Sequence, residues 1–331
     1  MKHRLSKRTV WTLSVLLLST SSLVALASKV FQVDVKMVMV SFTVKDESGR
    51  YVSGLTPKDI SLREDNLSQQ IASFNESGTA LTGTESTAAQ ARGASNSIFI
   101  LFDTSNCMYD GFARAEDEIA EFIRGLDGGQ AVAIYSFSHN MTRLQRLTTD
   151  HEHAVRALRT ASAGDSTAVL NATLLALRDA AQVPDRKMVV VFSNRPDDTS
   201  VVSPSDVARV AEDEGIPVDI IATKNPGPVC RSAFELLADS AGGQLFLADT
   251  SALQAQAFRD IGEDLKHTYT LTYYPAPNPN IGWRHIAIKV LPNSSNRYRI
   301  CARGGYWPHH QEEISQRSTS HDREDAGGGA R

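Results

Sequence analysis

The sequence has little cysteine and no excess of basic charge, and each shortage excludes a class of protein. Three cysteines in 331 residues are too few for a disulfide scaffold, and their odd number leaves one over. The formal net charge is −4. It becomes −8 without the four basic residues among the first eight, because 30 basic residues then stand against 38 acidic ones. A nucleic-acid-binding chain would carry a basic excess or stripe, so that class is excluded.

The motifs of several enzyme sites are also absent. No G-x-G-x-x-G follows the first strand expected in the α/β region, so a dinucleotide would have no phosphate cradle. The serines next to His139 lack the G-x-S-x-G elbow of a hydrolase. His151 and His153 are two positions apart, and such residues point away from each other on a helix. This spacing favours a solvated helix start over a zinc site.

The first 27 residues have the order of a secretory signal peptide. The basic start Met1–Arg8 leads into the apolar run Val10–Leu18, and small residues follow up to Ala27. An uncleaved anchor is the alternative, but the run contains Ser and Thr and is shorter than the ~20 residues that span a bilayer. We therefore predict cleavage after Ala27, no membrane span in the mature chain, and export to the periplasm or the extracellular space. In an exported chain Cys230 and Cys301 are the candidates for a disulfide, with three free thiols as the alternative.

Changes in residue pattern divide the rest of the chain. Alternating apolar and polar residues predict strands on both sides of a region where apolar runs alternate with helical patterns. A segment rich in Ser, Thr, Gly and Ala follows the first strands and predicts a flexible linker. The predicted organisation is a signal peptide at 1–27, an N-terminal β segment at 28–75, a linker at 76–96, an α/β domain at 97–266, a C-terminal β segment at 267–308 and a disordered tail at 309–331.

The fold class predicted for the central region is α/β, with a doubly wound, mostly parallel sheet covered by helices on both faces. Fully apolar runs are typical of strands that are buried on both faces. The expected strands are 98–102, 131–137, 187–193, 217–222 and 245–247, and the expected helices are 112–125, 153–161, 167–181, 205–214, 232–241 and 251–265. Each flank has only three or four short strands, too few for a core of its own. We therefore expect the two flanks to pair in one β-sandwich, with the α/β domain inserted between them.

Three loops of the α/β domain carry hydroxyls and carboxylates. In an open parallel sheet, sites form at the carboxyl ends of the strands where the strand order reverses. Oxygen side chains on separate loops suit a hard divalent cation such as Mg²⁺, which takes oxygen ligands and retains several waters. Asp103 would supply charge, and Ser105 and Thr167 would supply neutral oxygens.

These loops resemble the metal site of the von Willebrand factor A domain, and in particular of the exported "VWFA-related" type reported from acidobacteria. That family has Asp-x-Ser-x-Ser after the first strand, a Gly-Gly-Thr loop, and Ser-Asp-Gly-x-Asp after the fourth strand. The corresponding residues here are Asp103-Thr-Ser105-Asn-Cys107, Gly164-Asp-Ser-Thr167 and Ser193-Asn194-Arg-Pro-Asp197. The flanking strands are also similar to the family, so the resemblance extends over residues 31–308.

Two ligand positions depart from the family pattern. Cys107 places a sulfur where a hydroxyl is expected, and sulfur suits zinc or copper better than Mg²⁺. Asn194 removes a formal negative charge, which is worth about 4 kcal/mol for unit charges ~4 Å apart at an effective dielectric of about 20. Arg195 adds a positive charge to the same edge of the sheet. The resemblance thus implies a Mg²⁺ or Mn²⁺ site that is weakened or lost, with three remaining ligands and one outer-shell acid: Asp103, Ser105, Thr167 and Asp197.

The resemblance implies a non-enzymatic, exported module that binds a protein in the cell envelope or outside the cell. A ligand carboxylate would complete the coordination of the metal, and without metal the same rim would be a plain protein-binding surface. A cell-envelope hydrolase and a purely structural envelope component are the alternatives, although no nucleophile has an evident base in a recognisable motif. The three remaining ligand residues would, on a structural interpretation, cap helices and tie loops together by hydrogen bonds.

Overall fold

The computed structural model describes residues 37–77, 96–183, 186–193, 197, 199–224, 227–291 and 297–308. Of Cys107 it describes the backbone only. The predicted signal peptide, nearly all of the predicted linker and the predicted tail lie outside the described residues. Their boundaries, and those of the two predicted β segments, remain predictions.

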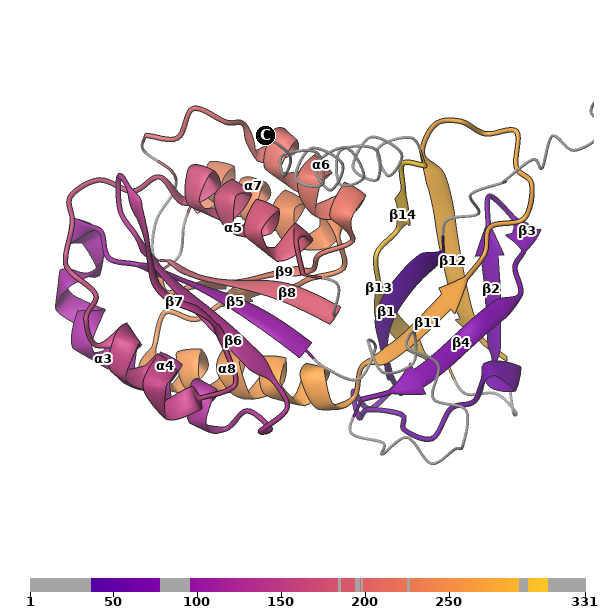
Figure 1. Cartoon of the computed structure of the whole chain (residues 1–331), viewed down its shortest axis with the longest axis horizontal. Coiled ribbons are helices and arrows are strands. Elements are labelled where there is room, and N and C mark those ends of the chain that lie inside the picture. Colours follow the sequence, from indigo (N-terminus) through magenta and orange to yellow (C-terminus); the bar gives the residue numbers. More distant parts are fainter. Residues whose placement is uncertain are drawn as a thin grey trace, which may run out of the picture. The chain divides into compact units, whose positions relative to one another are not determined.

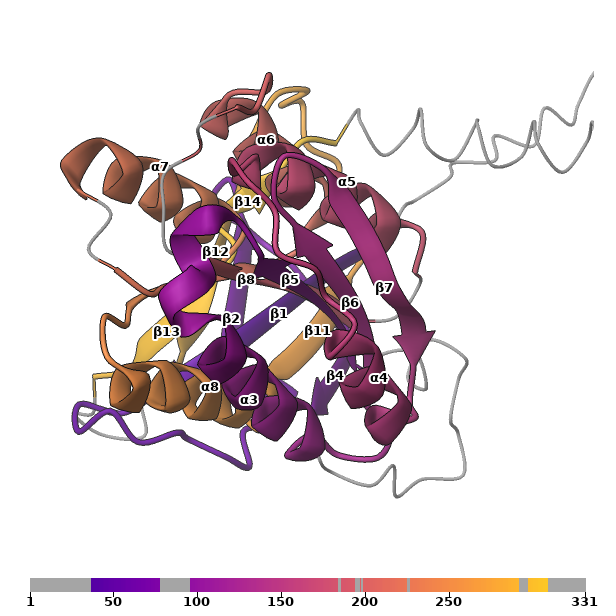
Figure 2. The same ribbon diagram turned by 90° about the vertical axis from the view of Figure 1, so that its left-hand side faces the viewer.

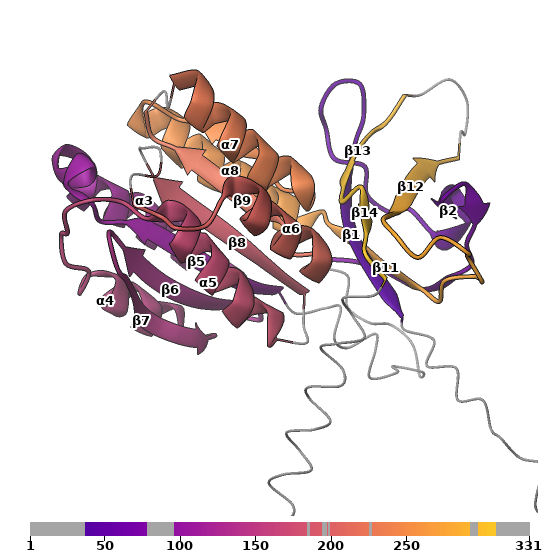
Figure 3. The ribbon, with the colours of Figure 1, turned by 90° about the horizontal axis from the view of Figure 1, so that it is seen from above.

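A six-stranded sheet forms the centre of the α/β region. Its strand order is β10-β9-β8-β5-β6-β7, and all neighbours run parallel except β7, which is antiparallel to β6. Figure 3 shows the five strands from β9 to β7. The strands are β5 (Asn96–Asp103), β6 (Ala131–Phe137), β7 (Met141–Thr148), β8 (Arg186–Ser193), β9 (Val218–Ala222) and β10 (Leu245–Leu247). Every residue of β5 is buried, as its continuous apolar run requires. Of the six strands β5 comes first along the chain, and later strands are added on both of its sides, so the strand order reverses at β5.

Helices cover both faces of this sheet (Figures 1 and 2). The helices α3 (Phe112–Arg124), α4 (His151–Leu158) and α8 (Ser251–Lys266) pack on one face, and α5 (Val169–Ala181), α6 (Pro204–Glu214) and α7 (Gly227–Ser240) pack on the other. Each face has its own buried apolar core. The α6 boundaries have local causes, because Ser203 and Asp206 form a capping box at its start and Gly215 ends it at φ 61°.

The two flanks form two antiparallel sheets that share one core. The first has the order β13-β1-β11-β4 and the second β14-β12-β2-β3. These strands are β1 (Val38–Lys45), β2 (Ile60–Glu64), β3 (Leu67–Ser68), β4 (Ile71–Glu76), β11 (Tyr269–Tyr273), β12 (Arg284–Val290), β13 (Arg299–Ala302) and β14 (Gly305–Tyr306). Strands of the two flanks alternate in the first sheet, and in the second sheet β12 of the C-terminal flank pairs with β2 of the N-terminal flank. The apolar side chains of both sheets meet in a single cluster. The predicted fold class, an α/β sheet inserted between β segments that form a β-sandwich, is confirmed.

Several details differ from the expected elements. Strand β7 was not expected, because its residues are only half-buried at the sheet edge and carry no continuous apolar run. The loop expected after β5 contains a 3-10 helix, η3 (Asn106–Gly111). Helix α7 begins at Gly227 instead of Ser232. Cys230 and Cys301 are both free thiols, so the alternative of unpaired cysteines holds for these two.

None of the described helices is long and apolar enough to cross a membrane.

Candidate functional site

Asp103 lies at the carboxyl end of β5, at the point where the strand order reverses. Its side chain is buried, with 0% exposure. Carboxylate Oδ1 accepts a hydrogen bond from the backbone N–H of Ser105 at 2.9 Å, and Oδ2 accepts one from Ser193 Oγ at 2.6 Å. Ser193 ends the neighbouring strand β8. The two central strands therefore hold this carboxylate between their carboxyl ends.

Backbone hydrogen bonds join the loop after β5 to the loop before α5. Asn106 N–H donates to the carbonyl of Asp165, and Gly164 N–H donates to the carbonyl of Thr104, both at 2.8 Å. Gly164 also lies against the loop after β6, because a Cβ at that position would lie 2.2 Å from Ser138 Oγ. The first two loops that the sequence selected are thus held side by side.

Two hydroxyls in these joined loops are buried without hydrogen-bond partners. Ser105 Oγ and Thr167 Oγ1 belong to residues with 0% exposure, and neither atom has a partner among the described residues. A buried polar group without a partner costs about 1–3 kcal/mol, so native structures rarely keep one without a reason. Thr167 does not cap a helix, because the N-cap of α5 is Ala168, which makes no side-chain cap hydrogen bond. The interpretation of these hydroxyls as caps and loop ties therefore does not describe their bonding.

Asp197 lies at the start of α5 and is bonded to backbone amides. Its Oδ2 accepts from Leu170 N–H at 2.7 Å, and its Oδ1 accepts from the N–H groups of Thr199 and Ser200 at 3.1 and 2.6 Å. A carboxylate suits this place because the first N–H groups of a helix have no partner within the helix. The outer-shell role predicted for Asp197 stays a prediction.

Of the two altered positions of the motif, the structure describes the backbone of Cys107 and leaves out Asn194. Cys107 lies within η3, and its side chain is outside the description. Asn194 and the neighbouring Arg195 lie outside the described residues. The effect of these three residues on a metal therefore rests on their chemistry alone.

The donor set fits a hard divalent cation. It comprises one buried carboxylate and two buried hydroxyls that lack partners, and Mg²⁺ and Mn²⁺ prefer such oxygen ligands together with water. The described residues contain no group of three His, Cys, Asp or Glu side chains placed to hold a metal. Burial, and to a lesser extent the charge of Asp197, raises the pKa of the Cys230 thiol to about 11, so this thiol stays protonated at neutral pH.

Two apolar side chains project from the same edge of the sheet. Val201 follows β8 and is 91% exposed, and Val229 lies in the first turn of α7, after β9, and is 86% exposed. We call the loops that follow β5, β8 and β9, together with the loop before α5, the rim.

Sequence reasoning missed two residues that shape this site. Ser193 was noted only as part of a motif, yet its hydroxyl holds Asp103. Ser138 was not selected, yet its carbonyl accepts from Ala168 N–H at 2.9 Å and its side chain packs on Gly164. A serine that ends a buried strand beside a motif was a usable signal for Ser193, whereas Ser138 carried none.

Comparisons with known proteins agree with the resemblance inferred from the loops. Residues 98–196 match the family model described as the von Willebrand factor type A domain. A search of curated proteins found no match. Among solved structures, the chain is similar to the conserved protein BatB from Bacteroides thetaiotaomicron, with 18% identity, a TM-score of 0.43, and coverage of 51% of this chain and 98% of the other.

Two further solved structures show similarity of the same order. The von Willebrand factor type A protein from Catenulispora acidiphila is 12% identical, with a TM-score of 0.45 and coverage of 85% of this chain and 76% of the other. The proximal thread matrix protein 1 from the mussel byssus, with a zinc-occupied MIDAS motif, is 13% identical, with a TM-score of 0.45 and coverage of 56% and 49%. Similarity at this level carries no information about function.

Proposed function

We propose that the α/β domain is a non-enzymatic protein-binding module with an altered metal-ion-dependent adhesion site at its rim. Asp103, Ser105 and Thr167 would hold the cation, which we take to be Mg²⁺ or Mn²⁺. The observation that carries this proposal is the pair of buried hydroxyls without partners, on loops that backbone hydrogen bonds join beside a buried carboxylate.

The cation, when bound, would offer an open coordination position to a carboxylate of the protein ligand. The chain's own residues supply the rest of the contact. Val201 and Val229, which are both exposed, would add apolar area to the contact. Ser193 would act as a positioning residue, because its hydroxyl fixes the orientation of the Asp103 carboxylate.

The rim offers little for hydrolysis. The hydroxyl of Ser193 is the one at the rim that donates a hydrogen bond to the Asp103 carboxylate, and both groups are buried. His139 is exposed, and its Nδ1 lies 3.4 Å from Thr199 Oγ1. A nucleophile needs a base that is itself held in position, and we assign no such pair here. A hydrolase and a purely structural component remain as outcomes of the tests.

We place the protein outside the cytoplasm, in the periplasm or the extracellular space, and its ligand in the envelope or beyond. The support is the predicted signal peptide at 1–27. N-terminal sequencing of the protein from the producing cell tests this: a start at or within a few residues of Ser28 is expected, and a start at Met1 contradicts export with cleavage.

Metal-dependent thermal stability tests the site. Binding to the native state alone raises stability with metal concentration, so Mn²⁺ or Mg²⁺ should raise the Tm relative to chelator. Asp103→Ala should abolish this rise because it removes the carboxylate ligand. Asp249→Ala is the matched control, since Asp249 is an exposed carboxylate shortly after β10 in the same sheet.

The results separate the candidate functions. Equal metal responses in Asp103→Ala and Asp249→Ala would remove the metal from the proposal. Binding of envelope proteins that is lost on adding EDTA supports a metal-dependent module. Turnover of ester, peptide or glycoside substrates that Asp103→Ala abolishes would favour the hydrolase instead. Rim substitutions and chelation that change nothing measurable would favour the structural component.

A further inference from the structure

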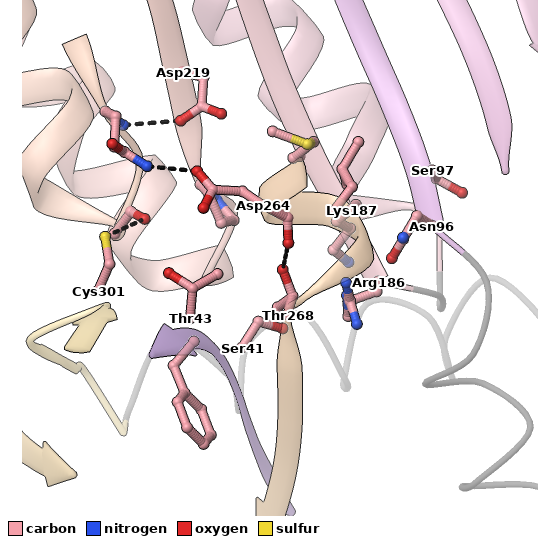
Figure 4. Close-up of a pocket in the computed structure, with 16 residues that line it drawn as sticks. Ser41, Thr43, Asn96, Ser97, Arg186, Lys187, Asp219, Asp264, Thr268 and Cys301 are labelled. Carbon is pink, nitrogen blue, oxygen red and sulfur yellow. Dashed lines mark hydrogen bonds between the residues drawn. The ribbon is translucent and has the colours of Figure 1, made fainter. Parts of the chain in front are cut away.

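A cavity of about 70 Å³ lies at the edge of the six-stranded sheet opposite the candidate metal site. Residues at or near the amino ends of β5, β8 and β9 form one wall, among them Asn96, Arg186 and Asp219 (Figure 4). The β-sandwich forms the other wall, with Thr43 of β1 and Cys301 of β13. One water needs about 10–15 Å³ by such a measure, so the cavity has room for several waters or one small molecule.

Arg186 brings a buried positive charge to this cavity. It is 8% exposed, and its Nη1 donates to Ser77 Oγ at 2.6 Å and to Thr270 Oγ1 at 3.1 Å. Both acceptors are neutral, and within the described part of the chain Arg186 forms no ion pair. Burial lowers the pKa of the guanidinium to about 10, so it remains charged at neutral pH. Guanidinium groups are seldom buried without a counter-charge, because desolvation of the ion is costly.

Two carboxylates, those of Asp219 and Asp264, also line the cavity, but among the described contacts neither forms an ion pair with Arg186. Asp264 lies 3.3 Å from Lys45 Nζ and accepts hydrogen bonds from the Tyr51 hydroxyl and the Gln244 side-chain amide, each at 2.7 Å. Asp219 accepts from Gln244 N–H at 2.8 Å. In Figure 4 the guanidinium lies on the Asn96 side of the cavity, away from Asp219.

The charge of these two carboxylates is reduced in different ways. Lys45 offsets the charge of Asp264. Burial raises the pKa of Asp219 to about 7, so this carboxyl is largely protonated in slightly acidic solution. A second cation, Lys187, also lines the cavity, and its Nζ donates to the carbonyl of Val183 at 2.8 Å. Arg186 differs from Lys187 in being buried, with only neutral hydroxyls as its described acceptors.

We propose that this cavity binds a small oxyanion, a carboxylate or an inorganic phosphate, through the guanidinium of Arg186. The planar fork of an arginine matches two oxygens of either group. Such an ion would supply the counter-charge that the described residues lack. It would also contact both the α/β sheet and the β-sandwich, so its binding would stabilise the junction between them.

Thermal titrations of the full mature chain test this proposal. Sodium acetate and sodium phosphate are added separately at pH 6.5, with the ionic strength held constant by sodium chloride. A saturable rise in Tm with acetate indicates a carboxylate ligand, and one with phosphate indicates a phosphate ligand. Arg186→Met should lose this rise. The matched control is Arg143→Met, which removes an exposed arginine that pairs with Asp179 and should leave the rise unchanged.

Two outcomes would overturn the proposal: the absence of any saturable rise in the natural protein, or the same rise in Arg186→Met. If Arg186→Met does not fold, two milder variants decide. Arg186→Lys keeps the charge but loses the fork, so its half-maximal shift should need more anion. Asp219→Asn removes a negative charge that would repel a bound anion at pH 8, so at this pH the variant should reach its half-maximal Tm shift at a lower anion concentration. Unchanged midpoints in both variants would refute binding at this cavity.

Discussion

Thr167→Val tests whether the buried hydroxyl at the rim is unsatisfied in the metal-free protein. Thr167 has 0% exposure, and its Oγ1 has no hydrogen-bond partner among the described residues. Valine replaces this hydroxyl with a methyl group of similar size. An unsatisfied buried hydroxyl costs about 1–3 kcal/mol. We therefore expect the free energy of unfolding in chelator to rise by up to about that amount, which corresponds to roughly 2–4 °C in Tm per kcal/mol for a domain of 150–250 residues.

Metal should make the natural protein more stable than Thr167→Val, which is the opposite of their order in chelator. The natural protein gains stability from the cation as its concentration rises above Kd. The Thr167→Val variant has lost one of three proposed ligands and should gain less. The assay is thermal unfolding followed by circular dichroism, in EDTA and across a Mn²⁺ titration.

Thr173→Val is the matched control for this substitution. Thr173 lies in the adjoining helix α5, is 1% exposed, and its Oγ1 donates to the carbonyl of Val169 at 2.7 Å. Removing a satisfied hydroxyl should lower the free energy of unfolding by about 0.5–1.5 kcal/mol. The two threonine-to-valine changes should thus have opposite signs in chelator and differ in their response to metal.

Two results would refute the reasoning. A loss of stability in EDTA similar to that of Thr173→Val would mean that the Thr167 hydroxyl has a partner. A Mn²⁺ response equal to that of the natural protein would mean that Thr167 is not a ligand.

Three further predictions concern separate parts of the chain. Cys107→Ser combined with Asn194→Asp should raise Mg²⁺ or Mn²⁺ affinity in calorimetry, because it restores a hydroxyl and a carboxylate; no gain would mean that the loops do not converge on a metal. Burial raises the pKa of Asp219 from 3.8 to about 7, so between these pH values the folded protein binds more protons than the unfolded chain. The stability that this proton binding contributes is lost as the pH rises through 7. Asp219→Asn should therefore have the higher Tm at pH 8, with a difference that shrinks toward pH 4, and a constant difference would contradict this. Gly215→Ala should lower the Tm, because its φ of 61° disfavours alanine and the added Cβ would approach Arg303 Nη1; an unchanged Tm would show that Arg303 moves aside freely.

Local sequence patterns determined most of the architecture of this protein. The central strand β5 could be assigned because its apolar run over 98–102 is typical of a strand covered on both faces. The pairing of the flanks followed from their size, since neither could bury a core alone. Strand β7 escaped prediction because an edge strand with half-exposed side chains needs no such run.

Local patterns also selected the residues at the rim, but not their bonding. Asp103 and Ser105 were recognised by type and by their place after a strand. The sequence suggested Thr167 as a cap of α5. In the structure the N–H of Leu170, near the start of this helix, instead donates to the carboxylate of Asp197 from another loop. A contact between loops about 30 residues apart has no signature in either loop.

The cavity at the opposite edge was decided by tertiary structure alone. In the sequence, Arg186 is an ordinary basic residue before an apolar strand. Its burial arises because the first sheet of the β-sandwich closes over the amino ends of the parallel strands and places Thr270 against the guanidinium. Short-range patterns determine which elements form and which faces they bury, because these depend on neighbouring residues. The charge left facing the cavity depends on which distant side chains meet, and only the folded chain brings them together.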